Sequence, residues 1–187
     1  MRFAPAILAS LVSAALAAPA KPVAHPPAKP VLDTLFAQLA KAGSPDDAKP
    51  IEDQIFAVFA QSGSPSVDLL MTRGAAAMGG GDTDTAKKLF VSVTSIAPNF
   101  AEGWHQRAQI EQQEDQDEAA MLSLQKAITL NPRQFEAMSE LGDLLEDYGN
   151  KPGALKLYRR ALALDPQLDG AAKHLRELEK DVEGQGI

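Results

Sequence analysis

Small, bulky and proline positions recur between Val67 and Leu168 at a fixed interval of 34 residues. The prolines of this series are Pro98, Pro132 and Pro166. An alanine stands 12 positions before each proline, in the series Ala86, Ala120 and Ala154. A large side chain follows each alanine by four positions, in the series Phe90, Leu124 and Tyr158. Another small residue lies earlier in each unit, at Gly74, Ala108 and Gly142. A period of this length with these residue types predicts an array of helix-turn-helix repeats.

This spacing fits units that each consist of two antiparallel helices. Small residues on both helices allow a close approach, since a larger side chain would overpack the contact at a cost of about 1–3 kcal/mol. We expect the bulky residue after each alanine to fill the wider gap towards the next unit. The prolines end each second helix because proline cannot continue a helix. The three units are predicted to span residues 67–100, 101–134 and 135–168.

Amphipathic segments flank the three units. Before them, one helical face carries the apolar residues Val31, Leu32, Leu35, Phe36 and Leu39. Ser44-Pro45 then combines an N-cap residue with proline at the first helical position, which predicts a second helix. We therefore predict a divergent N-terminal helix pair over residues 31–66 that caps the outer side of the first unit. Apolar residues at Ala171, Leu175, Leu178 and Val182 predict a C-terminal capping helix and tail over residues 169–187.

The first 30 residues are typical of an exported protein. Arg2 precedes a short apolar run, and Ala18-Pro19-Ala20 offers small residues for cleavage, with Ala15-Leu16-Ala17 as a second candidate. The run is shorter than the roughly 20 residues of a membrane span, so a signal peptide over residues 1–20 is favoured over an uncleaved anchor. Residues 21–30 are proline-rich and predict an extended linker. We expect a periplasmic or secreted protein without a stable membrane anchor after cleavage.

The repeated pattern resembles the tetratricopeptide repeat (TPR) family. That family carries an aromatic residue, Leu-Gly and Tyr on the first helix, and Ala, Phe, Ala and Pro on the second. On the first helices, Trp104 matches the aromatic position and Leu141-Gly142 match the Leu-Gly pair. On the second helices, the matches are Ala86, Phe90 and Pro98, then Ala120, Ala127 and Pro132, and then Ala154, Ala161 and Pro166. The departures are Leu70 and Met138 at the aromatic position, Arg73 and Arg107 at the Leu position, and Ala77, Glu111 and Leu145 at the Tyr position.

The resemblance implies a fold class and a style of binding. The expected fold is all-α, a right-handed TPR-like solenoid of antiparallel helix pairs with three clear repeats. A signal peptide followed by a short array is similar to small exported TPR proteins of bacterial envelopes. Their role, as the resemblance implies, is protein–protein interaction as an adaptor, a chaperone-like scaffold or an assembly factor, and it implies no reaction.

Composition and charge narrow the range of partners. The chain has 187 residues, a formal net charge of −7 and no cysteine. Nucleic acid and anionic membrane surfaces both require a basic protein surface, so neither is expected as a partner. The lack of cysteine excludes disulfides, thiol catalysis and thiolate metal sites.

No constellation of residues in the sequence indicates an active site, a cofactor site or a metal site. His25, His105 and His174 share no local spacing typical of metal ligands. The glycine run at 79–81 lacks a following Lys-Ser/Thr, so a turn is favoured over a phosphate cradle. The acidic stretch at 114–118 lacks the glycine-turned ligands of a calcium loop and is also expected to be a turn. We therefore expect a protein that is not an enzyme.

The concave surface, which the first helices line in the TPR family, is the candidate binding groove. By this resemblance, the first unit contributes Met71, Ala75 and Met78. The second unit contributes Glu102, His105, Gln109, Gln112 and Gln113. The third unit contributes Glu136, Ser139, Asp143, Glu146 and Asp147. The inner surface is thus expected to change from apolar through amide-rich to acidic, and its acidic end would repel an acidic peptide tail.

Three functions are consistent with these observations. The first is a monomeric adaptor that binds a basic or polar protein segment, with an apolar anchor near Met71 and Met78, because methionine adapts to irregular ligands. The second is a structural component that assembles end to end, although the charged last helix disfavours stacking there. The third is an enzyme or a small-molecule binder of unrecognised type. The binding surface in each case could be the concave groove, the convex side or an end of the array.

Overall fold

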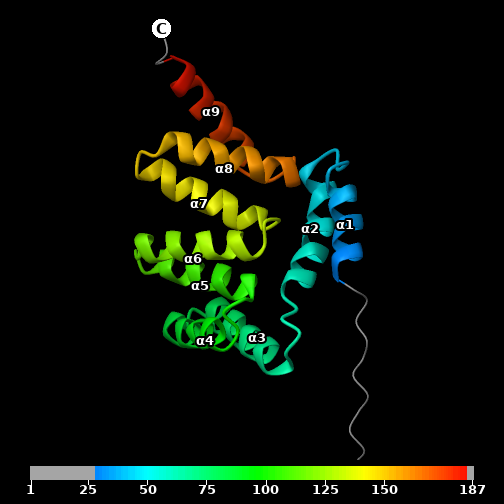
Figure 1. Ribbon diagram of the computed structural model, residues 1–187, viewed down its shortest axis with the longest axis vertical. Helices are drawn as coiled ribbons and strands as arrows, with labels where there is room; N and C mark the ends of the chain where they lie inside the picture. Colours follow the sequence, from blue (N-terminus) through cyan, green and yellow to red (C-terminus); the bar gives the residue numbers. More distant parts are fainter. Residues whose placement is uncertain (1–27, 185–187) are drawn as a thin grey trace, which may run out of the picture.

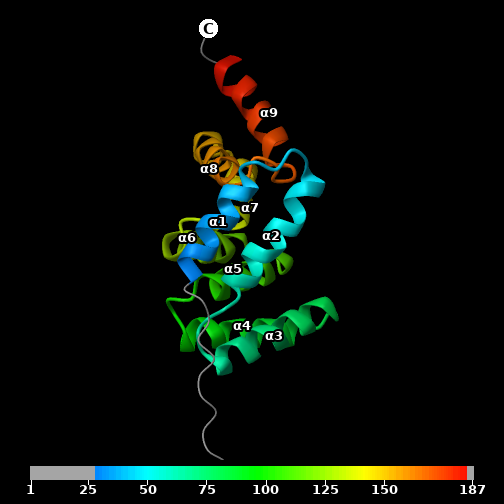
Figure 2. The ribbon, with the colours of Figure 1, turned by 90° about the vertical axis from the view of Figure 1, so that its right-hand side faces the viewer.

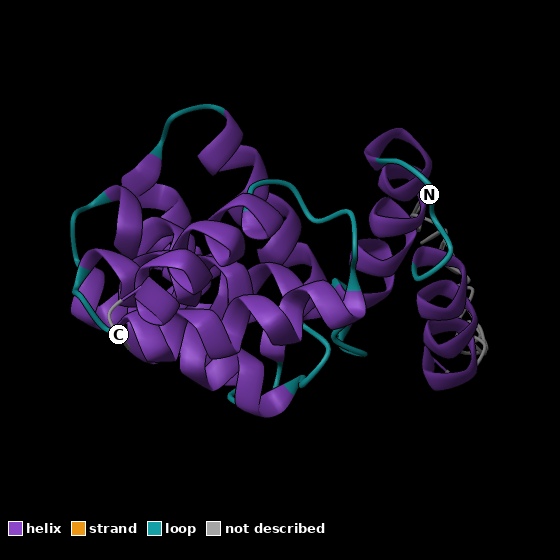
Figure 3. Ribbon diagram, turned by 90° about the horizontal axis from the view of Figure 1, so that it is seen from above, coloured by secondary structure: helices purple, strands orange, loops and turns teal. Residues whose placement is uncertain are grey.

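The computed structural model describes residues 28–184, and within that range the chain forms nine α-helices and no strand (Figure 3). The helices are α1 Ala28–Leu39, α2 Pro45–Phe59, α3 Pro65–Gly79, α4 Thr83–Ile96, α5 Ala101–Gln113, α6 Asp117–Leu130, α7 Phe135–Asp147, α8 Lys151–Leu164 and α9 Ala171–Gly184. The all-α prediction is therefore confirmed for this part of the chain. The predicted signal peptide, residues 21–27 of the predicted linker and the last three residues lie outside the described range.

Helices α3 to α8 form three antiparallel pairs that stack in chain order, as Figure 1 shows. Each helix packs against the next one along the chain, from α3 through to α9. Helix α9 lies on the last pair, where Ala171 and Leu178 are buried together with Ala154 and Tyr158. The predicted solenoid of helix pairs is therefore confirmed, since every unit packs mainly on its neighbours in sequence.

Small and bulky residues interlock within the first and third units. A Cβ atom on Gly74 would come within 2.5 Å of the Phe90 ring, and one on Gly142 would come within 2.8 Å of the Tyr158 ring. Both rings are fully buried and have no room to move away. Each ring thus takes the space left by the glycine of its own first helix, and it also packs towards the next element, since Phe90 shares a core with Ile110 of α5 and Tyr158 with Ala171 of α9.

The turns inside the three units share one backbone conformation. Gly81, Asp115 and Gly149 occupy equivalent positions and have φ values of 77°, 55° and 78°. Glycine adopts such positive φ values at no steric cost, and aspartate is among the side chains that tolerate them best. The acidic stretch around Asp115 is therefore a turn of the same kind as the two glycine turns, as expected from the sequence.

Two departures from the family pattern in the second unit compensate each other. Arg107 replaces the usual leucine, and Glu111 replaces the usual tyrosine one helical turn later. The Arg107 Nε atom donates to Glu111 Oε1 over 2.7 Å, and Ser123 of α6 donates to Glu111 Oε2 over 2.6 Å. A buried charge is tolerated when it is paired and hydrogen-bonded, so this polar contact replaces an apolar one between α5 and α6.

Helix α1 begins at Ala28, three residues before the predicted start at Val31. Residues 28–30 therefore belong to the helix and not to the linker. Pro30 does not prevent this, because proline is tolerated in the first turn, where backbone N–H groups have no helical partner. Helix α2 begins as predicted, since Ser44 Oγ accepts a hydrogen bond from the Asp47 backbone N–H over 3.2 Å.

The α1–α2 pair lies beside the stack and does not cap its first unit, as Figures 2 and 3 show. The Phe135 ring at the start of α7 contacts the rings of Phe36 and Phe56, with centroids 6.1 Å and 5.4 Å away. Arg133 lies over the Phe36 ring and forms an ion pair with Asp33 over 2.6 Å. These contacts attach the pair to the second and third units along the side where one unit connects to the next.

The predicted N-terminal cap is thus a helix pair in a different place. Its buried residues share a core with Phe135 and Met138, whereas the core around Val67, Met71 and Phe90 contains no residue of α1 or α2. The physical reason is the aromatic side chains of α1 and α2, which find their partner in Phe135. As a consequence, the C-terminal end of α2 lies next to the start of α3 and α5 and becomes one wall of the inner surface.

Candidate interaction groove

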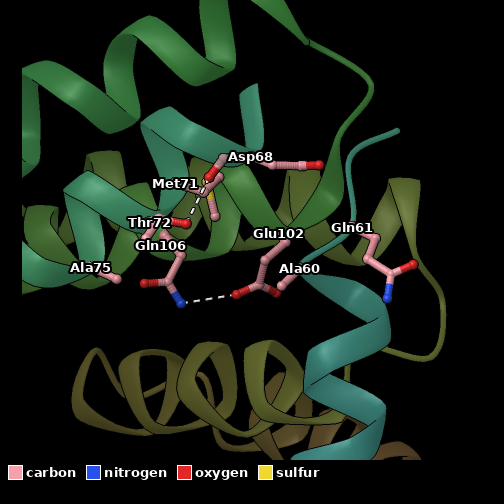
Figure 4. Close-up of a pocket in the computed structure, with 8 residues that line it drawn as sticks. All are labelled: Ala60, Gln61, Asp68, Met71, Thr72, Ala75, Glu102 and Gln106. Atoms are coloured by element: carbon pink, nitrogen blue, oxygen red, sulfur yellow. Dashed lines mark hydrogen bonds between the residues drawn. The ribbon is translucent and has the colours of Figure 1, made fainter. Parts of the chain in front are cut away.

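A pocket of about 490 Å³ opens on the inner surface between the end of α2 and helices α3 and α5 (Figure 4). Its lining residues are Ala60, Gln61, Asp68, Met71, Thr72, Ala75, Glu102 and Gln106. Met71 is the apolar centre of the pocket and is itself only 8% exposed. The small side chains of Ala60 and Ala75 leave the space open, so the pocket can accept an apolar side chain of another molecule.

Carboxylates lie at this pocket and are already fixed in position. The Asp68 carboxylate accepts a hydrogen bond from the Ser62 backbone N–H over 2.9 Å. The Glu102 carboxylate accepts one from Gln106 over 2.9 Å and one from Gln134 over 2.7 Å. Burial opposes the ionisation of Glu102, but hydrogen bonds from His105, Gln106 and Gln134 and the charge of His105 lower its pKa. The charged form of Glu102 is therefore favoured beside an apolar pocket.

His105 of α5 is the centre of a buried polar network between α5 and α7. Its Nε2 atom lies 3.0 Å from Glu140 Oε2, and its Nδ1 atom lies 3.6 Å from Glu102 Oε2. Gln109 donates to the other oxygen of Glu140 over 3.1 Å. Burial alone would lower the pKa of His105, but the charges and hydrogen bonds of Glu140 and Glu102 raise it well above its usual value. The raised pKa favours the protonated form of His105 between the two carboxylates, and the Gln134 Nε2 atom lies 3.2 Å from its Nδ1 atom.

Glu136, one helical turn before Glu140, differs from the other acids of this surface. Its side chain is half-buried and has no hydrogen bond or ion pair with any residue in the range 28–184. Burial raises its pKa to about 7; the nearby charges of Glu140 and Glu102 add to this effect, while His105 and Lys49 oppose it. Glu136 is thus a carboxyl group that changes its charge near neutral pH.

The acidic end of the predicted groove is less open than the sequence indicated. The Tyr158 hydroxyl donates to Asp143 over 2.5 Å and to Glu146 over 3.1 Å. The His174 Nδ1 atom lies 3.1 Å from Glu146 Oε2, so α9 also reaches this site. Burial raises the pKa of Asp143, although the hydrogen bond from Tyr158 opposes this. Only Asp147 of the three predicted acids is exposed without a partner among the described residues.

The predicted groove residues thus fall into different environments. Met71, Ala75 and Glu102 line the pocket, while His105, Gln109 and Glu136 lie around the polar network. Met78 packs partly into the core of the first unit, Ser139 and Gln112 are half-buried, and Gln113 is exposed. Sequence reasoning missed Glu140, Gln134 and Tyr158. Glu140 could have been found from its spacing to Glu136, but no local signal marks the other two.

A metal site and a membrane-spanning helix are two further possibilities for residues 28–184. No group of three or more histidine, aspartate or glutamate side chains in this range is arranged to hold a metal ion. Within the same range, no helix combines the length and the hydrophobicity needed to cross a bilayer. The chemistry of the inner surface is therefore that of one apolar pocket, a paired histidine and several carboxylates.

Models of protein families match two parts of the chain. Residues 101–134 and residues 135–168 each match a model described as "Tetratricopeptide repeat". These two ranges are the second and third units. A TPR repeat-containing protein of Rhizobium etli is 28% identical over 153 residues, which is 82% of this chain and 75% of the relative.

Solved structures with the same fold include two peptide complexes. The first TPR of Spaghetti (RPAP3), bound to an HSP90 peptide, has a TM-score of 0.58 and 21% identity, and the match covers 63% of this chain and 93% of that domain. The Yersinia enterocolitica type III secretion chaperone SycD, in complex with a peptide of the translocator YopD, has a TM-score of 0.58 and 13% identity. That match covers 64% of this chain and 96% of the chaperone. These similarities concern the repeat units and show a shared fold.

Proposed function

This chain is a tetratricopeptide-repeat protein, and we propose that it is a non-enzymatic interaction module that binds a segment of another protein in its concave groove. The observation that supports this most strongly is the open apolar pocket at Met71, beside the fixed carboxylate of Glu102. Apolar clefts with a few placed polar groups are the usual form of binding sites. Structures of the same fold hold peptides, which supports a peptide-like ligand here as well.

The proposed partner is a basic or polar segment. The first helices of the second and third units carry the acids Glu102, Glu136 and Glu140 on the inner surface, and only His105 balances them there. A carboxylate-rich ligand would be repelled, whereas lysine and arginine side chains would be attracted. The proposal assigns no reaction to the chain. Export to the periplasm, which the first 20 residues predict, is part of the same proposal, with the mature protein acting there as a monomeric adaptor.

Self-assembly is the second candidate function, and one feature of the first unit favours it. Leu69 is 51% exposed, although the equivalent residues of the other units, Gly103 and Ala137, are buried by the preceding unit. The α1–α2 pair leaves this outer face uncovered. Sedimentation of the free chain that does not depend on concentration would exclude this candidate.

The proposed function predicts that blocking the pocket abolishes binding. Peptides would first be selected on the full chain from a random display library, and one selected peptide would be synthesised. Ala75→Arg places a long side chain in the pocket, and Ala75 is exposed, so the fold should not change. We expect affinity for the peptide to fall at least about tenfold, a loss of about 1.4 kcal/mol in binding free energy, as measured by fluorescence anisotropy.

Ala76→Arg is the matched control for this prediction. Ala76 is the next residue of the same helix, is also exposed and does not line the pocket, and the variant adds the same charge. It should bind the peptide as the parent chain does. Equal binding by both variants, or an equal loss in both, would contradict a ligand site at Met71.

A further inference from the structure

Glu136 lies on the inner surface without a cationic partner among the described residues. The nearest helix that carries a lysine towards it is α2, but Lys49 of that helix pairs with Asp53 over 3.1 Å and lies 3.8 Å from Glu52. His105, the other cation near Glu136, is held between Glu102 and Glu140. A half-buried carboxylate that lacks a partner is destabilised as the anion, because burial disfavours the charged form. A cation supplied by a ligand would remove that penalty.

The charges that face Glu136 come from three helices. Glu140 stands on its own helix, Glu102 and His105 face it from α5, and Lys49 acts on it from α2. With His105 protonated, the two acids and the two cations of this set balance each other, so ionisation of Glu136 leaves the set with one negative charge. A positive group on a ligand is attracted to the ionised form of Glu136.

The apolar pocket and Glu136 are two parts of one surface. Glu102 lines the pocket and also acts electrostatically on Glu136, so it connects the two. A segment that crosses from α3 over α5 to α7 would meet the pocket first and Glu136 next. Neighbouring helices lie about 8–10 Å apart, and an extended chain rises about 3.3 Å per residue. From α3 to α7 there are two such steps, about 16–20 Å in all, so the side chains that occupy the two positions would lie about five or six residues apart.

We propose that the groove recognises a partner segment with an aliphatic residue in the Met71 pocket and, about five or six residues away, a lysine or arginine paired with Glu136. This inference rests on the proposed function and specifies its ligand. The charge complementarity selects against acidic segments, and the apolar centre of the pocket at Met71 favours an aliphatic side chain at the other position.

A cation at Glu136 couples binding to the release of a proton. The pKa of Glu136 is about 7, so near pH 7 the carboxyl group is protonated in about half of the free molecules. Pairing with lysine or arginine lowers that pKa, and the proton leaves to the solvent as the ion pair forms. His105 keeps its proton in both states because its pKa lies well above its usual value. Binding should therefore release up to about half a proton per peptide at pH 7.

Isothermal titration calorimetry of the full chain with the selected peptide tests this inference. Titrations at pH 7 in two buffers of different ionisation enthalpy give the number of protons released. We expect the parent chain to release up to about half a proton per peptide at pH 7 and Glu136→Gln to release none. At pH 8, the affinity of Glu136→Gln for the peptide should be about tenfold lower than that of the parent chain. Asp147→Asn, an exposed change on the same helix, should keep both values of the parent.

The outcomes separate this inference from the proposed function. In one outcome, peptide binding is lost in Ala75→Arg but releases no proton and is unchanged in Glu136→Gln. That result would overturn the inference and leave the groove as the binding site. Binding that is insensitive to Ala75→Arg would overturn both. A synthetic peptide of residues 21–30 that competes with the selected peptide would show that this chain fills its own groove. Loss of peptide binding as the chain self-associates would show that a second copy fills it. Either result would overturn the inference that a segment of another protein occupies the groove.

Discussion

Replacing His105 with alanine is expected to lower the free energy of unfolding by about 3–5 kcal/mol. His105 is 1% exposed and stands between the carboxylates of Glu102 and Glu140. Without the imidazolium, two acids on packed helices face each other with no cation between them, and a cavity forms beside them. Removal of one partner from a buried ion pair is costly because the other charge stays desolvated. Urea unfolding followed by circular dichroism measures the change.

His174→Ala is the matched control for this prediction. His174 also lies beside a glutamate, Glu146, but its side chain is 41% exposed. Exposed pairs contribute roughly 0–1 kcal/mol, so this variant should unfold almost as the parent does. If His105→Ala lost no more stability than His174→Ala, the polar network would not hold α5 against α7.

Raising the pH from about 5 to 8 is expected to weaken the attachment of the α1–α2 pair to the third unit. Glu52 of α2 meets Asp165, the fully buried residue that ends α8. Burial and the nearby charge of Asp165 raise the pKa of Glu52 to about 7. Burial also raises the pKa of Asp165, whose Oδ1 atom accepts a hydrogen bond from the Gln167 backbone N–H over 3.0 Å. Two carboxyl groups in contact need a proton between them, and alkaline solution removes it.

The sign of this effect follows from the raised pKa of Glu52. Below its unfolded value of 4.5 the group is protonated in both states, and no stability is lost. As the pH rises towards about 7, the Glu52 carboxyl group ionises in the unfolded chain but stays largely protonated in the folded chain. Stability therefore falls across this window, by at most about 3 kcal/mol for a shift of this size and by less where water screens the pair, and then levels off. Lys49 opposes the shift and Asp53 adds to it, but both act more weakly than Asp165.

Glu52→Gln tests this prediction, because the amide can donate a hydrogen bond to Asp165 at every pH. The variant should lose most of the pH dependence that Glu52 contributes and be more stable than the parent at pH 8. Asp53→Asn, an exposed change on the same helix, should keep the profile of the parent. A parent chain that is as stable at pH 8 as at pH 5 would contradict a shared proton at this contact.

The repeat array could be predicted from the sequence because its signal is local and periodic. Gly74 and Phe90, or Gly142 and Tyr158, belong to one unit and contact each other there. Even where the second unit departs from the family pattern, Arg107 and Glu111 lie four residues apart on one helix and compensate each other. Short-range spacing carries all of this information.

The place of the α1–α2 pair could not be predicted in the same way. An amphipathic pattern shows that a helix buries one face, but it does not show which surface covers that face. The decisive contacts join residues far apart in the chain. Phe36 contacts Phe135, and Asp33 forms an ion pair with Arg133. The Gln167 side chain donates a hydrogen bond to the Ala42 carbonyl over 3.1 Å. Nothing in the local sequence of either partner marks these pairs.

The candidate site was predicted in outline and not in detail. Family spacing placed Met71, Ala75 and Glu102 on the inner surface, and they line the pocket there. Glu140, one of the partners of His105, comes from another helix about one repeat away, and Tyr158 reaches Asp143 from the second helix of its unit. Burial and pairing decide which acids are open to a ligand, and both depend on tertiary contacts.

Hydrogen–deuterium exchange of the full chain, with and without the selected peptide, tests the central claim most directly. A ligand in the concave groove should slow exchange in α3 and α5 around the pocket and in the first turn of α7. The outer helices α4, α6 and α8 should exchange as in the free chain. Protection confined to those outer helices, or to the uncovered face at Leu69, would contradict a concave binding site.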